Sequence, residues 1–118
     1  RAHMAALAEV LRPKFDMVLN RLEEELEGSG LAVWSRPKGG YFISLDTLAG
    51  CAKRTVQLAK EAGVTLTGAT YPYKRDPQDR NIRIAPTYPT PEELKSAVDI
   101  FILCVKIAGI ELVVNQGN

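Results

Sequence analysis

Apolar side chains in the first quarter of the chain recur every three or four residues, the spacing of one face of an α-helix. Pro13 interrupts this series and is expected to start a second helix or to kink the first. Gly28 and Gly30 are expected to end it. The apolar positions are Met4, Leu7, Ala8, Leu11, Phe15, Val18, Leu19, Leu22 and Leu26.

Four short runs rich in β-branched and aromatic residues predict strands. Leu31 to Ser35 and Tyr41 to Asp46 are joined by five residues that include proline and glycine, which predicts an antiparallel hairpin. Val64 to Thr67 predicts a third strand, and Asn81 to Ala85 predicts a fourth.

A helix is expected between the second and third strands. Asp46 or Thr47 is expected to cap its start, and Gly63 to supply a left-handed residue at its end. Its inward positions are expected to be Ala52, Val56, Leu58 and Ala59.

The last helix has a clear start, because Thr90 to Glu93 supplies a cap, a first-turn proline and a reciprocal glutamate. Its apolar positions cover a wide face, so this helix should lie flat across the sheet and be mostly buried. Those positions are Leu94, Ala97, Val98, Phe101, Ile102, Val105, Ala108 and Leu112.

The resulting order is helix, strand, strand, helix, strand, strand, helix. Such an order predicts an α+β fold, a two-layer sandwich with a small, mainly antiparallel sheet covered on one face. Residues 1–118 have the length of a single domain. Residues 68–80 form a longer connection than usual, and connections of that length often have a functional role.

Composition narrows the class of protein. The chain is 46% hydrophobic and 25% charged, with a net charge of +1, which is typical of a globular domain and favours neither nucleic acid nor a membrane as a partner. Cys51 and Cys104 have no spacing typical of a metal site, so we interpret both as reduced core thiols. These features favour a cytoplasmic protein.

Few residues are candidates for chemistry. His3 is the single histidine, and no serine or cysteine has an evident base partner, so a nucleophile triad is excluded. Asp76 and Asp79 bracket a turn, which explains them better than a catalytic pair does. The glycines at 39 and 40 do not open a helix, so they form no phosphate cradle.

Arg83 differs from the other charged residues because it lies in the middle of a predicted strand. Alternation sends Ile82 and Ile84 to one face of that strand and Arg83 to the other. The planar guanidinium is suited to gripping a carboxylate with two parallel hydrogen bonds. The alternative is an ordinary arginine on the wet face of a half-covered sheet.

Four motifs occur in an order that resembles fold-type I aminotransferases. They are Pro-Lys-Phe at 13–15, Gly-Gly-Tyr-Phe at 39–42, Ala-Lys-Glu-Ala-Gly-Val at 59–64 and Asp-Arg-Asn-Ile-Arg-Ile-Ala-Pro at 79–86. The resemblance covers nearly the whole chain. It is strongest to the C-terminal small domain of the bacterial aspartate aminotransferase subgroup, which includes MocR-like proteins.

This resemblance implies that Arg83 binds the α-carboxylate of an amino-acid substrate. It also implies that Tyr41 and Phe42 start a strand beside the active site, where Phe42 either lines the substrate pocket or serves as a core aromatic. The 68–80 connection would border the entrance or help to close the site. Arg83, Phe42 and Tyr41 are therefore the candidate substrate-binding residues.

The resemblance also implies what lies elsewhere. The lysine and other groups that hold pyridoxal 5'-phosphate belong to the family's large domain, so no lysine of this chain is a candidate, and we expect no catalytic or cofactor-binding residue in it. The full-length enzyme would be a homodimer that transfers amino groups from an L-amino acid, such as aspartate, to a 2-oxo acid. This C-terminal part would pack on its own N-terminal large domain and, alone, would be inactive, free of cofactor and left with a bare apolar patch.

Two other functions remain open. A small α+β domain with a strand arginine is compatible with a stand-alone regulatory module that binds an amino acid, although such modules usually have a strand-helix-strand-strand-helix-strand order. The parent protein is alternatively a transcription regulator with an aminotransferase-like sensing domain.

Overall fold

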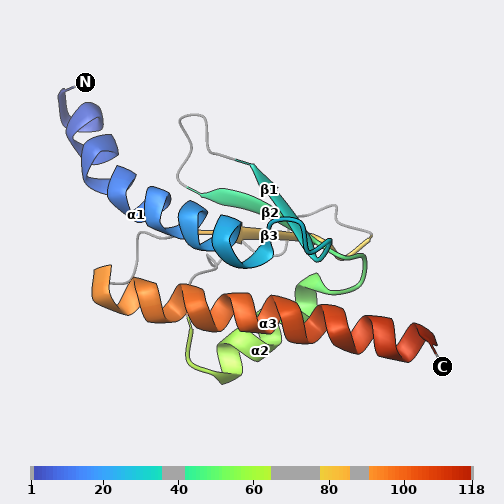
Figure 1. Cartoon of the computed structure of the whole chain (residues 1–118). Helices are drawn as coiled ribbons and strands as arrows, with labels where there is room; N and C mark the ends of the chain where they lie inside the picture. Colours follow the sequence, from blue (N-terminus) through green and yellow to red (C-terminus); the bar gives the residue numbers. More distant parts are fainter. Residues whose placement is uncertain (1, 36–41, 65–77, 86–90, 118) are drawn as a thin grey trace.

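In the computed structural model, the described part of the chain forms three helices and three strands (Figure 1). The structure describes residues 2–35, 42–64, 78–85 and 91–117. Side chains are described for 12–35, 42–64, 78–85 and 92–115. The order is α1 (Ala2–Leu26), β1 (Ala32–Ser35), β2 (Ile43–Thr47), α2 (Ala52–Glu61), β3 (Asn81–Ile84) and α3 (Pro91–Gly117). This is the α+β class that the sequence predicts.

The described strands form one antiparallel sheet in the order β1-β2-β3. Trp34 lies opposite Leu45, and Leu45 lies opposite Ile82. The predicted hairpin and the predicted strand at 81–85 are therefore confirmed. Most of the strand predicted at 64–67 falls outside the described residues, and Val64 itself lies in no strand.

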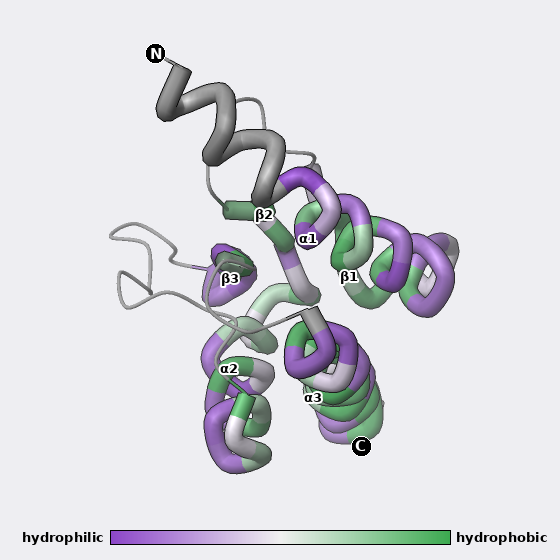
Figure 2. The backbone as a smooth tube through the Cα atoms, turned by 90° about the vertical axis from the view of Figure 1, so that its left-hand side faces the viewer, coloured by the Kyte–Doolittle hydropathy of each residue, from purple (hydrophilic) through white to green (hydrophobic). Residues whose placement is uncertain are grey.

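One face of the sheet is apolar and fully covered. Ile43, Leu45, Ile82 and Ile84 have no exposed surface, and they share one hydrophobic core with side chains of all three helices. Burying a side chain of this size stabilises the fold by about 1.5–3 kcal/mol. Figures 1 and 2 show α2 and α3 side by side below the sheet, in the helical layer of the predicted two-layer sandwich.

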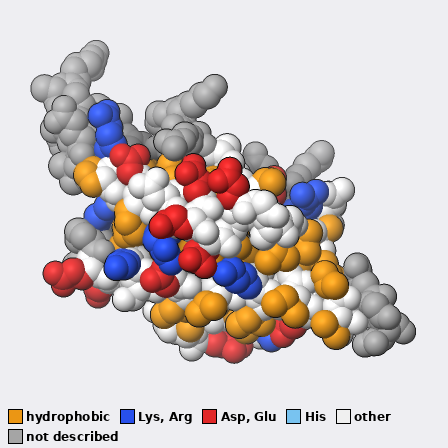
Figure 3. Space-filling model, viewed as in Figure 1, with side chains coloured by type: hydrophobic (Ala, Val, Ile, Leu, Met, Phe, Trp, Pro, Cys, Tyr) orange, Lys and Arg blue, Asp and Glu red, His pale blue; other side chains and the backbone are white. Residues whose placement is uncertain are grey.

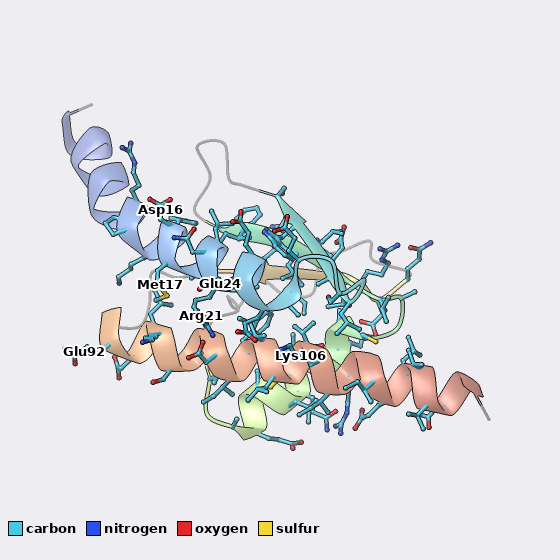
Figure 4. The ribbon with its side chains drawn as sticks, in the orientation of Figure 1. Asp16, Met17, Arg21, Glu24, Glu92 and Lys106 are labelled. Atoms are coloured by element: carbon cyan, nitrogen blue, oxygen red, sulfur yellow. The ribbon has the colours of Figure 1, made fainter. Side chains whose placement is uncertain are left out.

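Helix α1 runs through Pro13 without ending, so the predicted alternative of a second helix starting there is wrong. Proline removes one helical hydrogen bond, but the turns that follow bury their apolar face against α3. Arg21 donates to Asp99 at 2.9 Å, and Lys106 donates to Glu25 at 3.0 Å. Figure 4 shows Arg21 and Lys106 between the two helices.

The start of α2 differs from the prediction. Asp46 and Thr47 belong to β2, and the residue before the helix, Cys51, makes no side-chain capping bond. Asp79 caps the helix instead, because its carboxylate accepts the N–H of Lys53 at 3.0 Å and its carbonyl accepts that of Ala52 at 3.0 Å. The cap thus comes from a residue distant in the sequence.

The end of α2 is as predicted, because Gly63 adopts a left-handed backbone with φ of 81°. The inward side chains agree in part. Ala52 and Ala59 are buried, whereas Val56 and Leu58 are only partly covered. Thr55 is also buried, although its hydroxyl made it a poor candidate for an inward position.

Helix α3 is buried over part of its surface only. Most of its predicted inward side chains are covered, and Ala97 and Leu112 are half-covered. The predicted Thr90 cap lies outside the described residues. Five apolar side chains of α3 are at least 44% exposed, which agrees with the expected bare patch and is visible along α3 in Figure 3. They are Leu103, Ile107, Ile110, Val113 and Val114.

Both cysteines are free and buried, as predicted. Cys51 donates from Sγ to the carbonyl of Ala108 at 3.5 Å. Burial raises the pKa of both thiols above the usual value, and the negative charges of Asp79 and Glu111 raise that of Cys51 further. Neither thiol is therefore activated as a nucleophile.

The Asp79 cap is expected to stabilise the domain. Asp79→Ala should lower the free energy of unfolding by about 2 kcal/mol, because it removes the carboxylate that accepts from Lys53 and places alanine at a φ of 54°, where aspartate and asparagine are better tolerated. Asp79→Asn should lower the free energy of unfolding much less. Urea denaturation checks both, with the exposed Asp16→Ala as the control. Equal stability of Asp79→Ala and the unmodified chain would contradict the assignment.

The two thiols should also be unreactive in the native state. At pH 8, a thiol reagent should modify Cys51 and Cys104 slowly in the folded chain and rapidly in denaturant, since only the exposed thiolate reacts. Mass spectrometry after timed labelling separates the two sites. Rapid labelling of either cysteine before unfolding would show that its burial is not maintained in solution.

Candidate functional site

The candidate site lies on the face of the sheet that turns away from the apolar core. Because opposite residues in antiparallel strands share a face, Ser35, Ser44 and Arg83 form one row across the sheet, and Val33, Asp46 and Asn81 form the next. Val33 is 62% exposed. Polar groups therefore dominate one face of the same strands whose other face is isoleucine and leucine.

Arg83 lies in this face as alternation predicts, between the buried Ile82 and Ile84. Its side chain is half-buried. Its guanidinium carbon Cζ is 4.6 Å from the centroid of the Phe42 ring. A cation–π contact at this distance holds the positively charged head group beside the ring and restricts its movement.

Phe42 precedes β2, so the prediction that it starts the strand is wrong by one residue. Its side chain is 37% exposed, which excludes the core-aromatic alternative. Tyr41 lies outside the described residues, as does most of the 68–80 connection. The structure thus brings together two of the three candidate residues, Arg83 and Phe42.

A hydrogen-bonded group beside Arg83 was not anticipated. The Nδ2 of Asn81 donates to Ser44 Oγ at 2.9 Å and to Asp46 Oδ1 at 2.9 Å. Asn81 and Arg83 are two residues apart in one strand, so alternation alone places them on the same face. That signal was present in the sequence, but the pairing with β2 was needed to add Ser44 and Asp46.

The start of β3 is fixed by its neighbour. Thr47 donates its N–H to the carbonyl of Arg80 at 2.8 Å, and the Nε of Arg80 donates to the Thr47 carbonyl at 3.0 Å. Together with the Asp79 cap, these bonds join the end of β2, the start of α2 and the start of β3. These bonds therefore fix the position of the start of β3, the strand that carries Asn81 and Arg83.

A second feature lies at the far edge of the sheet. A hollow of about 270 Å³ is lined by the end of α1 and by β1, including Glu23, Glu27 and Trp34. Its acidic rim is unsuited to a carboxylate ligand. It does not include Arg83 or Phe42.

No group of three potential metal ligands occurs among the described residues. Among the described lysines, Lys53, Lys60 and Lys95 are exposed, Lys14 is half-buried, and Lys106 pairs with Glu25. None of the helices in the described part of the chain has the length and apolar character needed to cross a bilayer.

Comparisons with known proteins agree with this description. The family model for aspartate amino-transferase matches residues 1–117. An aspartate aminotransferase of Corynebacterium glutamicum is 49% identical over 113 residues, which are 94% of this chain and 26% of that protein. The chain therefore spans about a quarter of the length of the curated relatives that it matches.

Solved structures show the same fold. That of an aspartate transaminase from Corynebacterium glutamicum matches with a TM-score of 0.77 and 50% identity, over 86% of this chain and 24% of that one. The fold alone is shared with an α-aminoadipate aminotransferase from Thermus thermophilus complexed with N-(5'-phosphopyridoxyl)-L-leucine, at a TM-score of 0.69 and 21% identity, over 85% of this chain and 25% of that one. On the match of the family model to nearly every residue, this chain belongs to the aspartate amino-transferase family.

Proposed function

We propose that residues 1–118 are the C-terminal small domain of a pyridoxal-phosphate-dependent aminotransferase, and that they supply the arginine that binds the substrate α-carboxylate. The reaction of the full-length protein is amino transfer from an L-amino acid, aspartate in the first instance, to a 2-oxo acid. The observation that carries the proposal is Arg83 on the polar face of the sheet, with its Cζ 4.6 Å from the centroid of the Phe42 ring, in a chain of this family.

The geometry suits Arg83 to this role. Its backbone is fixed in β3, and the Phe42 ring restricts its head group, so less conformational entropy is lost when a carboxylate binds than for an arginine on a mobile loop. Two parallel hydrogen bonds would fix both the position and the plane of the carboxylate. Holding the carboxylate fixes the direction of the substrate Cα–H bond, which is the bond that must break in amino transfer.

The rest of the site has to come from outside this chain. The matched relatives are about four times as long as the aligned segment, so most of the sequence of such a protein lies outside this chain. We therefore assign pyridoxal phosphate, which serves as the electron sink of the reaction, to the large domain of the full-length protein. That domain would face Arg83 and Phe42, and the full-length protein would be a homodimer, located in the cytoplasm. Tyr41 and the 68–80 connection would border the substrate entrance.

The first test replaces Arg83 in the full-length protein. Arg83→Ala should raise KM for both the amino acid and the 2-oxo acid by roughly 100-fold, since two hydrogen bonds to a charged group are worth about 3 kcal/mol together. KM for Arg83→Lys should lie between the values for the unmodified protein and Arg83→Ala, because lysine keeps the positive charge but lacks the planar guanidinium that makes two parallel hydrogen bonds. Steady-state kinetics with L-aspartate measure the effect.

Arg12→Ala is the matched control, because Arg12 is exposed on α1 and far along the chain from β3. It should leave both Michaelis constants unchanged. Unchanged KM and turnover in Arg83→Ala would show that this arginine does not bind substrate.

The second test concerns the isolated 118-residue chain. Titration calorimetry with L-aspartate or L-glutamate should give no heat of binding, because a carboxylate held from one side only remains solvated and gains little. Added pyridoxal phosphate should produce no transaminase activity. Specific binding of either amino acid would instead favour a stand-alone regulatory module.

A further inference from the structure

Ser44 is placed to take part in the same interaction as Arg83. The two residues are directly opposite in the pairing of β2 with β3, so their Cβ atoms are about 5 Å apart on the polar face of the sheet. Arg83 reaches diagonally along this face toward Phe42. The Ser44 side chain lies between that cationic end and the polar group formed by Asn81 and Asp46.

The direction of the Ser44 hydroxyl follows from its neighbours. An ionised Asp46 carboxylate only accepts hydrogen bonds, so the Asn81 amide must turn its NH₂ group toward it. The same Nδ2 is 2.9 Å from Ser44 Oγ, so Ser44 accepts the second amide hydrogen. Its own O–H proton must then point elsewhere, and among the residues that the structure describes no acceptor for it is found.

Charge decides where an anion would bind on this face. The row that contains Asn81 is negatively charged because it includes the Asp46 carboxylate. The Asn81 amide that donates to this carboxylate is neutral, so it does not cancel the charge. The guanidinium of Arg83 gives the opposite end a positive charge. A carboxylate would therefore approach the Arg83 end, and Ser44, directly opposite Arg83, carries the hydroxyl of the neighbouring strand in that row.

We propose that Ser44 is a second carboxylate ligand, whose hydroxyl donates to the substrate carboxylate that Arg83 grips. Asn81 acts through Ser44 as a positioning residue, and Asp46 acts through Asn81. This inference rests on the proposed function of Arg83, because it adds a donor to the same subsite. It makes the subsite a three-donor site formed by two adjacent strands.

The test separates contact with the carboxylate from a general effect on the site. In the full-length protein, inhibition constants against turnover of L-aspartate are measured for L-2-aminobutyrate and for propylamine, which differ only in the α-carboxylate. Ser44→Ala should raise the inhibition constant of L-2-aminobutyrate roughly tenfold, the value expected for the loss of one hydrogen bond to a charged group. The inhibition constant of propylamine should stay unchanged. Ser44→Thr keeps the hydroxyl and should restore tight binding.

Ser35→Ala is the matched control. Ser35 is exposed in the same row of the sheet but on the far side of Ser44 from Arg83, so its removal should change neither constant. Thermal unfolding of each variant shows whether it is folded. If Ser44→Ala proves unfolded, Ser44→Val tests the same loss with a residue that favours a strand.

The outcomes distinguish this inference from the function on which it rests. Equal weakening of both inhibitors by the Ser44 variant would mean a distorted site, and would overturn the role of Ser44 as a ligand. No effect at Ser44, with strong weakening of L-2-aminobutyrate in Arg83→Ala, would overturn it while leaving the proposed function intact. No effect in either variant would overturn both.

Discussion

The register between β2 and β3 determines which side chains of this domain meet. In that register Ile43 lies opposite Ile84 and Leu45 opposite Ile82, so four fully buried side chains pack between the sheet and the helices. The same pairing places Ser44 opposite Arg83 on the other face. A slip of one residue would exchange the two faces of β3 and bury a guanidinium in an apolar core. The stability of the core and the position of the candidate site therefore depend on one pairing.

Several contacts outside the ladder reinforce this pairing. Arg80 and Thr47 exchange main-chain and side-chain bonds at the point where β2 ends and β3 begins. Asp79, the residue before Arg80, caps α2. Because α2 also packs against α3, the strand that carries Arg83 is tied to the helical layer by the two residues that precede it. Rigid attachment of this kind is what a carboxylate grip requires, since a loosely held guanidinium would lose more entropy on binding.

Much of this was predictable from the sequence. Alternation around Arg83 identified both the strand and the outward direction of the side chain, and Gly63 marked the end of α2. The cap of α2 was mispredicted because local rules look for it in the residues just before the helix, whereas Asp79 arrives from a segment far along the chain. The group of Ser44, Asp46 and Asn81 was missed for a similar reason. Asn81 lies 37 residues from Ser44 and 35 from Asp46 along the chain, and only strand pairing brings it to them.

We propose that the guanidinium of Arg83 binds a substrate carboxylate on one side, and that the rest of the full-length protein encloses that carboxylate on the other side. A crystal structure of the full-length protein with bound L-aspartate tests it most directly. We expect two Arg83 nitrogens within about 3 Å of the α-carboxylate oxygens, with the guanidinium still beside the Phe42 ring. Arg83 paired with an internal acid, or directed away from a ligand held elsewhere, would contradict it.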